Sequence, residues 1–132
     1  GSAIPEGFIH EVQGNDPETG LAAVEHFLAL PERPTAIFCF NDQLAAGVLQ
    51  GLHRTGLQVP QDCSVAGFDN IKFSAYTLPP LTTFSQPKRE IGLEAAQLLL
   101  KLLEPEGELQ TQVIRALRGR LLVRESTGPA IK

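Results

Sequence analysis

The feature that most constrains this chain is a repeated change of hydrophobic period along its length. Short, nearly continuous apolar runs, such as residues 35–40 and 63–68, alternate with longer stretches whose apolar side chains recur every three or four positions. The runs are typical of strands covered on both faces, and the longer stretches are typical of amphipathic helices. Strands that alternate with helices at this spacing predict an α/β fold built on a doubly wound parallel sheet.

The bounds of the expected elements follow from the residues that begin and end helices. Helices are predicted after Asp16, after Asn41 and from Pro87, because a capping side chain or a helix-starting proline stands at each of these points. Gly56 is the predicted end of the second helix. The predicted strands are residues 8–13, 35–40, 63–68, 81–85, 111–117 and 120–125, and residues 69–80 are predicted to form a loop with a helical turn near 73–76.

Composition and charge exclude several classes of protein. Of the 132 residues 42% are hydrophobic and 20% charged, as in ordinary soluble domains. No run reaches the roughly 18 apolar residues of a membrane helix, so no membrane partner is expected. A net charge of −4 argues against a free-standing nucleic-acid binder. Residues 111–132 carry five Lys or Arg and one acid, which we interpret as a half-buried strand with its arginines on the solvent face.

The usual signatures of catalysis and of metal binding are missing from the sequence. It has no Gly-rich phosphate loop, no serine elbow, no paired-histidine zinc helix and no cysteine zinc pairs. Cys39 and Cys63 each lie inside an apolar run, so we expect two buried free thiols. The sequence therefore predicts no cofactor, no metal and no catalytic residue.

Polar side chains gather where the predicted strands end. In a doubly wound sheet, ligands bind beyond the carboxyl ends of the strands, which are here residues 38–42, 67–70 and 83–86. Asp69 lies at such an end, and a carboxylate there can accept two hydrogen bonds from sugar hydroxyls or from the N–H groups of a base. A loop-capping aspartate would occupy the same position, so both interpretations of Asp69 stay open.

Other residues at these ends also have a structural interpretation beside a binding one. Asn41 fits a helix cap, the commoner role, or an amide that contacts a ligand. Gln86 fits a plain surface glutamine as well as a donor and acceptor for a ligand. Phe38 fits core packing, the default for phenylalanine, or stacking on a flat ligand. Asp42 is interpreted as a first-turn acid favoured by the helix dipole.

Five segments of the chain match, in order and spacing, the sequence of a known family. They are Pro34–Phe38, Asn41–Gly47, Gly56–Asn70, Pro79–Pro87 and Leu122–Thr127. Together they span nearly the whole chain, and in combination they resemble the C-terminal part of the effector-binding region of LacI/GalR-type bacterial transcription regulators. The resemblance implies a region of the periplasmic-binding-protein type, in which two lobes clasp a small effector.

The resemblance also implies roles for individual residues. Asp69 matches the family's effector-binding acid, and Asn41 matches a position that contacts sugars in sugar-responsive members. Phe38 matches an aromatic residue that stacks on purines in another branch, and Gln86 matches a polar residue between the lobes near the cleft. Phe40 departs from the small residue common at its position, so the effector cannot be copied from a relative. The implied partner is a sugar-like or purine-like small molecule.

Only part of the family's region is present in these residues. Residues 1–80 and 113–128 match the C-terminal lobe without its first strand and helix, and residues 81–112 match a segment that belongs to the other lobe. In the family, this region follows a helix-turn-helix DNA-binding head and forms homodimers. The free thiols expected at Cys39 and Cys63 are consistent with the reducing cytoplasm. We expect DNA contact only through such a head, which is absent here. The apolar stripe of residues 81–112 should be covered, in the chain alone, by exchange with a second copy or by rearranged packing.

Two other classes of protein stay open beside a non-enzymatic regulator. A periplasmic sugar-binding protein of an ABC transporter shares the fold, although the amino-acid sequences of Val59–Asp62 and Leu81–Thr83 favour the regulator. An α/β hydrolase-like enzyme would use Asp42 and Asp69 as its carboxylates.

Overall fold

The structure is a computed structural model that describes residues 4–103 and 114–130. The chain divides into two compact units, one comprising residues up to Ser85 and from Leu121, and the other Gln86–Arg120. In chain order the elements are η1 (Glu6–Phe8), α1 (Pro17–Leu28), β1 (Ala36–Phe38), α2 (Asp42–Arg54), β2 (Ser64–Phe68), η2 (Lys72–Ala75), β3 (Thr82–Ser85), α3 (Lys88–Leu102) and β4 (Arg120–Leu122), where η marks a 3-10 helix.

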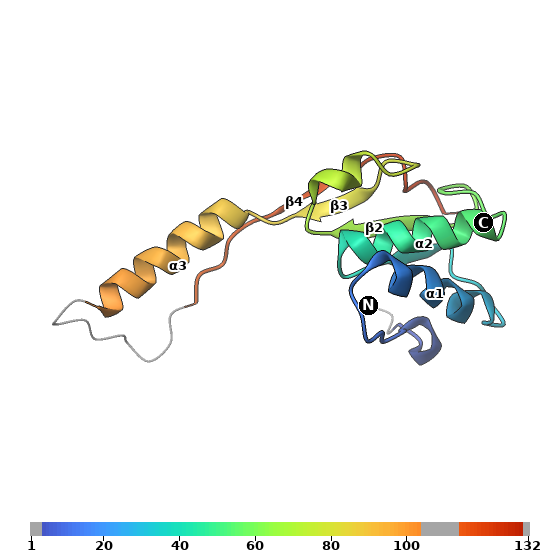
Figure 1. The fold of residues 1–132 in the computed structure, drawn as a ribbon, viewed down its shortest axis with the longest axis horizontal. Helices are drawn as coiled ribbons and strands as arrows, with labels where there is room; N and C mark the ends of the chain where they lie inside the picture. Colours follow the sequence, from blue (N-terminus) through green and yellow to red (C-terminus); the bar gives the residue numbers. More distant parts are fainter. Residues whose placement is uncertain (1–3, 104–113, 131–132) are drawn as a thin grey trace. The chain divides into compact units, whose positions relative to one another are not determined.

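The strands form one four-stranded sheet in the order β1-β2-β3-β4 (Figure 1). β1 and β2 run parallel, with Ile37 opposite Val65, and β2 and β3 run parallel, with Gly67 opposite Thr83. The predicted α/β class with a parallel sheet is confirmed, because each crossover between these parallel strands contains a helix or a helical turn.

Helices α1 and α2 pack side by side, and α2 lies against β2 (Figure 1). Their close approach depends on two glycines. A side chain at Gly20 would meet the backbone carbonyl of Leu44, and one at Gly47 would meet that of Pro17. The apolar core lies between these two helices and the sheet. Its most buried side chains are Val24, Leu44, Ala45, Val48, Leu49, Leu52, Cys63, Val65 and Leu81.

The predicted helix ends are confirmed by their cap geometry. The Asp16 carboxylate accepts a 2.7 Å hydrogen bond from the Thr19 amide at the start of α1. The Asn41 side-chain oxygen accepts one of the same length from the Leu44 amide at the start of α2. Gly56 follows α2 with a φ of 81°, a left-handed conformation that glycine adopts without steric cost.

Two strand predictions at the ends of the chain differ from the structure. Of the predicted strand 8–13, Phe8 ends η1 and residues 9–13 belong to no strand, although their side chains alternate. A strand needs a ladder partner, and here Val12 packs on the core while His10 stacks on His26. Of the predicted strand 111–117, residues 111–113 lie outside the described residues and 114–117 form no strand.

The predicted burial of the first strand on both faces is also wrong. Ile37 is buried, but its neighbours Ala36 and Phe38 are exposed. Helices α1 and α2 cover only the face of β1 to which Ile37 and Cys39 contribute, and the face that carries Phe38 is open. The apolar run alone could not indicate that one face of this strand is uncovered.

The described residues of the second unit contain one long helix, α3. None of its residues is buried, and Ile91, Leu93, Leu99, Leu100 and Leu102 are exposed. No helix in the described part of the chain has both the length and the apolar character needed to cross a membrane.

Candidate functional site

The carboxyl ends of β1 and β2 lie next to each other in the first unit. Phe38 is the register partner of Ala66, and the Cys39 amide donates a 2.8 Å hydrogen bond to the Ala66 carbonyl. The residues that follow, Asn41 after β1 and Asp69 after β2, are therefore brought to one edge of the sheet, as the sequence predicts.

Phenylalanines occupy the sheet face opposite the helices at this edge. The side chains of Phe38 and Phe40 are 67% and 58% exposed, so neither is a core residue. Phe68 and Phe84 are register partners whose rings stack with centroids 5.2 Å apart. The same parity that buries Ile37 turns these rings away from the core, which leaves aromatic surface available for stacking.

Asp69 and Asn70 form a turn with left-handed backbone angles directly after β2. Their φ values are 105° and 49°, which are uncommon for residues other than glycine. The Asp69 amide donates to the Phe84 carbonyl at 2.9 Å, and the Asn70 amide donates to the Thr83 hydroxyl at 3.2 Å. The turn is thus tied to β3 by two successive amides.

Asp42, the first residue of α2, is buried beneath this turn with 1% of its surface exposed. One carboxylate oxygen accepts a 2.5 Å hydrogen bond from the Thr83 hydroxyl, and the other accepts a 2.8 Å bond from the Ile71 amide. The expected first-turn position is confirmed, and the structure adds that both oxygens are engaged inside the protein.

Arg124 corrects the prediction that the arginines near the C-terminus lie on a solvent face. Its guanidinium is half-buried and donates to the Leu81 carbonyl at 2.6 Å, to the Asn70 side-chain oxygen at 2.9 Å and to the Ser74 hydroxyl at 3.2 Å. Alternation with apolar residues could not reveal this, because the three acceptors lie more than 40 positions earlier in the chain.

Asn41 has the capping role that the sequence favours. Besides its bond to the Leu44 amide, its side-chain nitrogen donates to the Asn15 carbonyl at 3.1 Å. One N–H and one lone pair of the amide remain for a ligand. Gln86 begins the second unit, where its carbonyl accepts a 2.9 Å hydrogen bond from the Lys88 amide.

Comparison with known proteins identifies the fold described above. Residues 5–127 match the family model described as a periplasmic binding protein-like domain. The chain belongs to this family. It is 45% identical over 119 residues to the HTH-type transcriptional repressor PurR of Vibrio campbellii (strain ATCC BAA-1116), covering 85% of this chain and 35% of that protein.

Two further similarities confirm the resemblance to LacI/GalR-type regulators. The probable HTH-type transcriptional repressor ExuR of Bacillus subtilis (strain 168) is 47% identical over 109 residues, which is 81% of this chain and 33% of that protein. A LacI family transcriptional regulator from Enterococcus faecium, solved with bound ribose, superposes with a TM-score of 0.74 at 35% identity, covering 88% of this chain and 42% of that one. The chain spans about a third of the length of the curated relatives that it matches.

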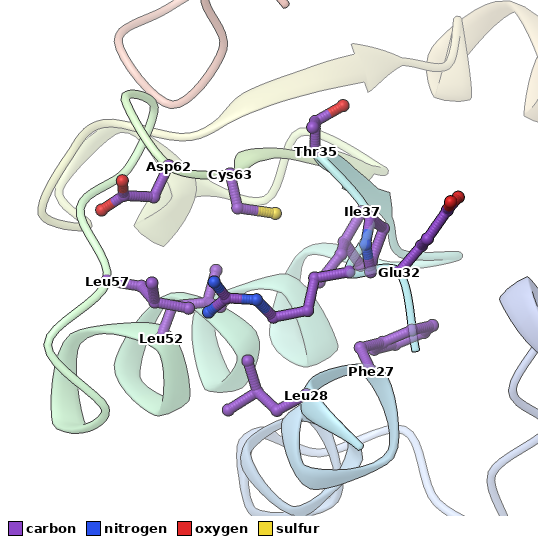
Figure 2. Close-up of a pocket in the computed structure, with 11 residues that line it drawn as sticks. Phe27, Leu28, Glu32, Thr35, Ile37, Leu52, Leu57, Asp62 and Cys63 are labelled. Carbon is purple, nitrogen blue, oxygen red and sulfur yellow. The ribbon is translucent and has the colours of Figure 1, made fainter. Parts of the chain in front are cut away.

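Two cavities in this periplasmic-binding-protein-like unit lie away from Asp69. One, of about 540 Å³, lies at the amino ends of β1 and β2, where Thr35, Asp62 and Cys63 line it together with Leu52 and Leu57 (Figure 2). The other, of about 940 Å³, lies between the outer side of α2 and the residues around η2, and its exposed apolar side chains are Phe73, Tyr76 and Leu78.

The two cysteines are buried free thiols, as predicted. Burial raises the pKa of Cys39 to about 12 and that of Cys63 to about 11, because the thiolate would lose its hydration. Among the described residues no group of three or more His, Cys, Asp or Glu side chains is placed to hold a metal ion.

Proposed function

We propose that this chain is part of the effector-binding region of a LacI-type DNA-binding transcription regulator, and that it binds a sugar-like or purine-like molecule beyond the carboxyl ends of β1 and β2. The observation that carries the proposal is the Asp69 turn. A carboxylate at the end of a parallel strand, on a backbone held in an uncommon conformation, is characteristic of a ligand site.

The surroundings of Asp69 support a ligand with hydroxyl or N–H donors and a flat face. Asp69 would accept two hydrogen bonds, Asn41 would contribute its remaining N–H and lone pair, and Phe38 would stack on a ring. Gln86 would contact the effector from the segment after β3. The ribose in the Enterococcus faecium structure supports a sugar, and Phe38 supports a purine equally.

The parent protein is proposed to have the organisation of the matched repressors. Residues 1–80 and 113–128 would belong to one lobe, and residues 81–112 to the other, with the effector between the lobes. DNA would be bound by a separate head, in the cytoplasm and as a homodimer. The exposed Phe73, Tyr76 and Leu78 support an apolar interface between copies. Sedimentation of the complete protein at micromolar concentration tests this, and a strict monomer would contradict it.

The alternatives have less support. The relatives named above are a transcriptional repressor, a probable transcriptional repressor and a transcriptional regulator, which favours a regulator over the binding protein of an ABC transporter. A hydrolase that uses Asp42 and Asp69 together is disfavoured, because Asp42 is buried and both of its oxygens already accept hydrogen bonds inside the protein.

Calorimetric titration of the complete protein with ribose and with purine bases tests the proposed site. We expect at least one probe to bind, and Asp69→Asn to weaken that binding at least tenfold, because the amide replaces one of the two acceptor oxygens with an NH2 donor and removes the negative charge. Asp62→Asn is the matched control, since Asp62 flanks the opposite end of β2 and should not affect the affinity. Equal affinities of the Asp69→Asn variant and the unaltered protein would contradict the assignment.

A further inference from the structure

We propose that Asp42 is a positioning residue for the effector site: its buried carboxylate holds the Asp69–Asn70 turn in the conformation that presents Asp69 to a ligand. This inference rests on the proposed function, because it assumes that Asp69 contacts the effector. It assigns to the buried acid of α2 a task other than starting a helix.

Two hydrogen bonds of the turn depend on Asp42. One oxygen accepts directly from the Ile71 amide at 2.8 Å. The other accepts from the Thr83 hydroxyl, whose oxygen in turn accepts from the Asn70 amide at 3.2 Å. With its proton donated to Asp42, the hydroxyl must present a lone pair to Asn70. Asp42 therefore fixes one amide of the turn directly and a second through Thr83.

The turn has a backbone conformation that needs support from its surroundings. Asp69 and Asn70 adopt φ values of 105° and 49°, and a non-glycine residue keeps such angles only where its surroundings impose them. Three successive amides, those of Asp69, Asn70 and Ile71, have acceptors in β3 or α2. Without the two that depend on Asp42, the turn would relax, and ligand binding would have to restore it.

The Asp42 carboxylate is buried at the start of α2. A charged group that is 1% exposed is unfavourable unless it is satisfied, and the start of α2 contributes the favourable end of the helix dipole. The neighbouring strand makes room for it, since a side chain at Gly67 would meet the Asp42 oxygen itself. The fold therefore accommodates the Asp42 side chain through its hydrogen bonds and through the absence of a side chain at Gly67.

Paired substitutions at Thr83 separate positioning from stability. Thr83→Val keeps the shape of the fully buried side chain and removes the hydroxyl, whereas Thr83→Ser keeps the hydroxyl and removes a methyl group. The complete protein is titrated with ribose and purine bases, and affinities are compared for the probe that binds most tightly. We expect Thr83→Val and Asp42→Asn to lower this affinity about tenfold, and Thr83→Ser to change it less than twofold. If the role of Thr83 were only structural, Thr83→Ser, which loses a methyl group, would lower the affinity more than Thr83→Val, which keeps the shape of the side chain.

The control is Ser126→Ala. Ser126 is also fully buried and bonds to β2 and β3, through the Val65 carbonyl and the Thr82 amide, but at the opposite ends of these strands. This variant should lower the unfolding temperature and leave probe affinity within twofold.

Amide hydrogen exchange at Asn70 and Ile71 is measured on the same variants without a ligand. We expect exchange at least tenfold faster in Thr83→Val than in Thr83→Ser. Equal exchange rates in Thr83→Val and Thr83→Ser would overturn the positioning role. Unchanged probe affinity in Thr83→Val and Asp42→Asn would also overturn it, provided that Asp69→Asn loses affinity. Either result leaves the proposed function standing. If no probe binds, or if Asp69→Asn binds normally, the proposed function fails and the positioning inference fails with it.

Discussion

The Thr83 hydroxyl on β3 donates a 2.5 Å hydrogen bond to the carboxylate of Asp42 at the start of α2, 41 positions earlier in the chain. Both residues are buried, and Thr83 is fully so. The bond joins a helix to a strand that is not its neighbour in sequence, at the edge of the sheet where Asp69 lies. An unpaired polar group is costly when it is buried, so loss of either partner would destabilise this edge of the sheet. The hydrogen bond keeps the edge rigid only while both side chains are present.

Gly67→Ala should destabilise the first unit by about 2 kcal/mol, since a methyl group there would meet the Asp42 oxygen and lie 3.0 Å from the Leu81 side chain. Urea denaturation measures the change. Gly92→Ala is the matched control, because that position on α3 has no heavy atom within 4 Å and helical alanine is favoured over glycine. Equal denaturation midpoints for the Gly67→Ala variant and the unaltered protein would contradict the packing described.

Arg124→Lys should cost about 2 kcal/mol of stability, although charge is conserved. One ammonium group cannot replace a planar guanidinium that reaches the Leu81 carbonyl, Asn70 and Ser74 at once. Thermal unfolding measures the loss, and the exposed Arg118→Lys should show none. A variant as stable as the unaltered protein would show that these three bonds are dispensable.

Asp16→Ala should reduce stability in a pH-dependent way. The hydrogen bond from the Thr19 backbone amide holds the pKa of Asp16 below its usual value of 3.8. A lowered folded-state pKa contributes stability that is present above 3.8 and is lost as pH falls through the folded-state pKa. Urea unfolding at pH 7 and pH 3 should therefore show a smaller difference between the variant and the unaltered protein at pH 3. Asp16→Asn removes the same titrating carboxyl but keeps a capping oxygen, so its stability difference from the unaltered protein should shift between pH 7 and pH 3 by the same amount as that of Asp16→Ala. A difference for Asp16→Ala that stays constant with pH would contradict the prediction.

The cysteines should be unreactive in the folded protein at pH 8, because their raised pKa values leave almost no thiolate. A raised thiol pKa contributes stability below the unfolded value of 9.0, which is lost as pH rises through about 11 and about 12. Replacing both cysteines by alanine should therefore flatten the fall in stability between pH 8 and pH 10.5. Labelling of the folded chain as fast as that of the urea-unfolded chain would contradict the burial of both thiols.

The 132-residue chain by itself should associate at micromolar concentration, because α3 exposes five large apolar side chains. Light scattering should show a mass above that of one chain, and Leu99→Glu should lower it. Gln97→Glu adds the same charge on the same helix and should have little effect, since Gln97 is a polar exposed residue. A strict monomer that binds no hydrophobic dye would contradict the expectation.

Local interactions explain which parts of the fold were predictable. Asp16 and Asn41 cap the helices that follow them, and Gly56 ends α2, because the groups involved lie within a few positions of each other. The parallel sheet followed from the alternation of periods, which reflects burial averaged over whole elements. Residues 8–13 show the limit of such reasoning, since their alternation fits a strand but the ladder partner that a strand needs is not encoded locally.

The position of Asp69 at the end of a buried strand was readable in the sequence, as was the presence of Asn41, Phe38 and Gln86 at equivalent ends. The tertiary structure decided what surrounds them: the left-handed turn, the burial of Asp42, and the half-buried Arg124 that reaches Asn70. The physical reason is range. Helix starts, strand runs and strand ends depend on neighbours in sequence, whereas the hydrogen bonds that hold the Asp69 turn join residues 13 to 54 positions apart and exist only once the sheet and α2 have packed together.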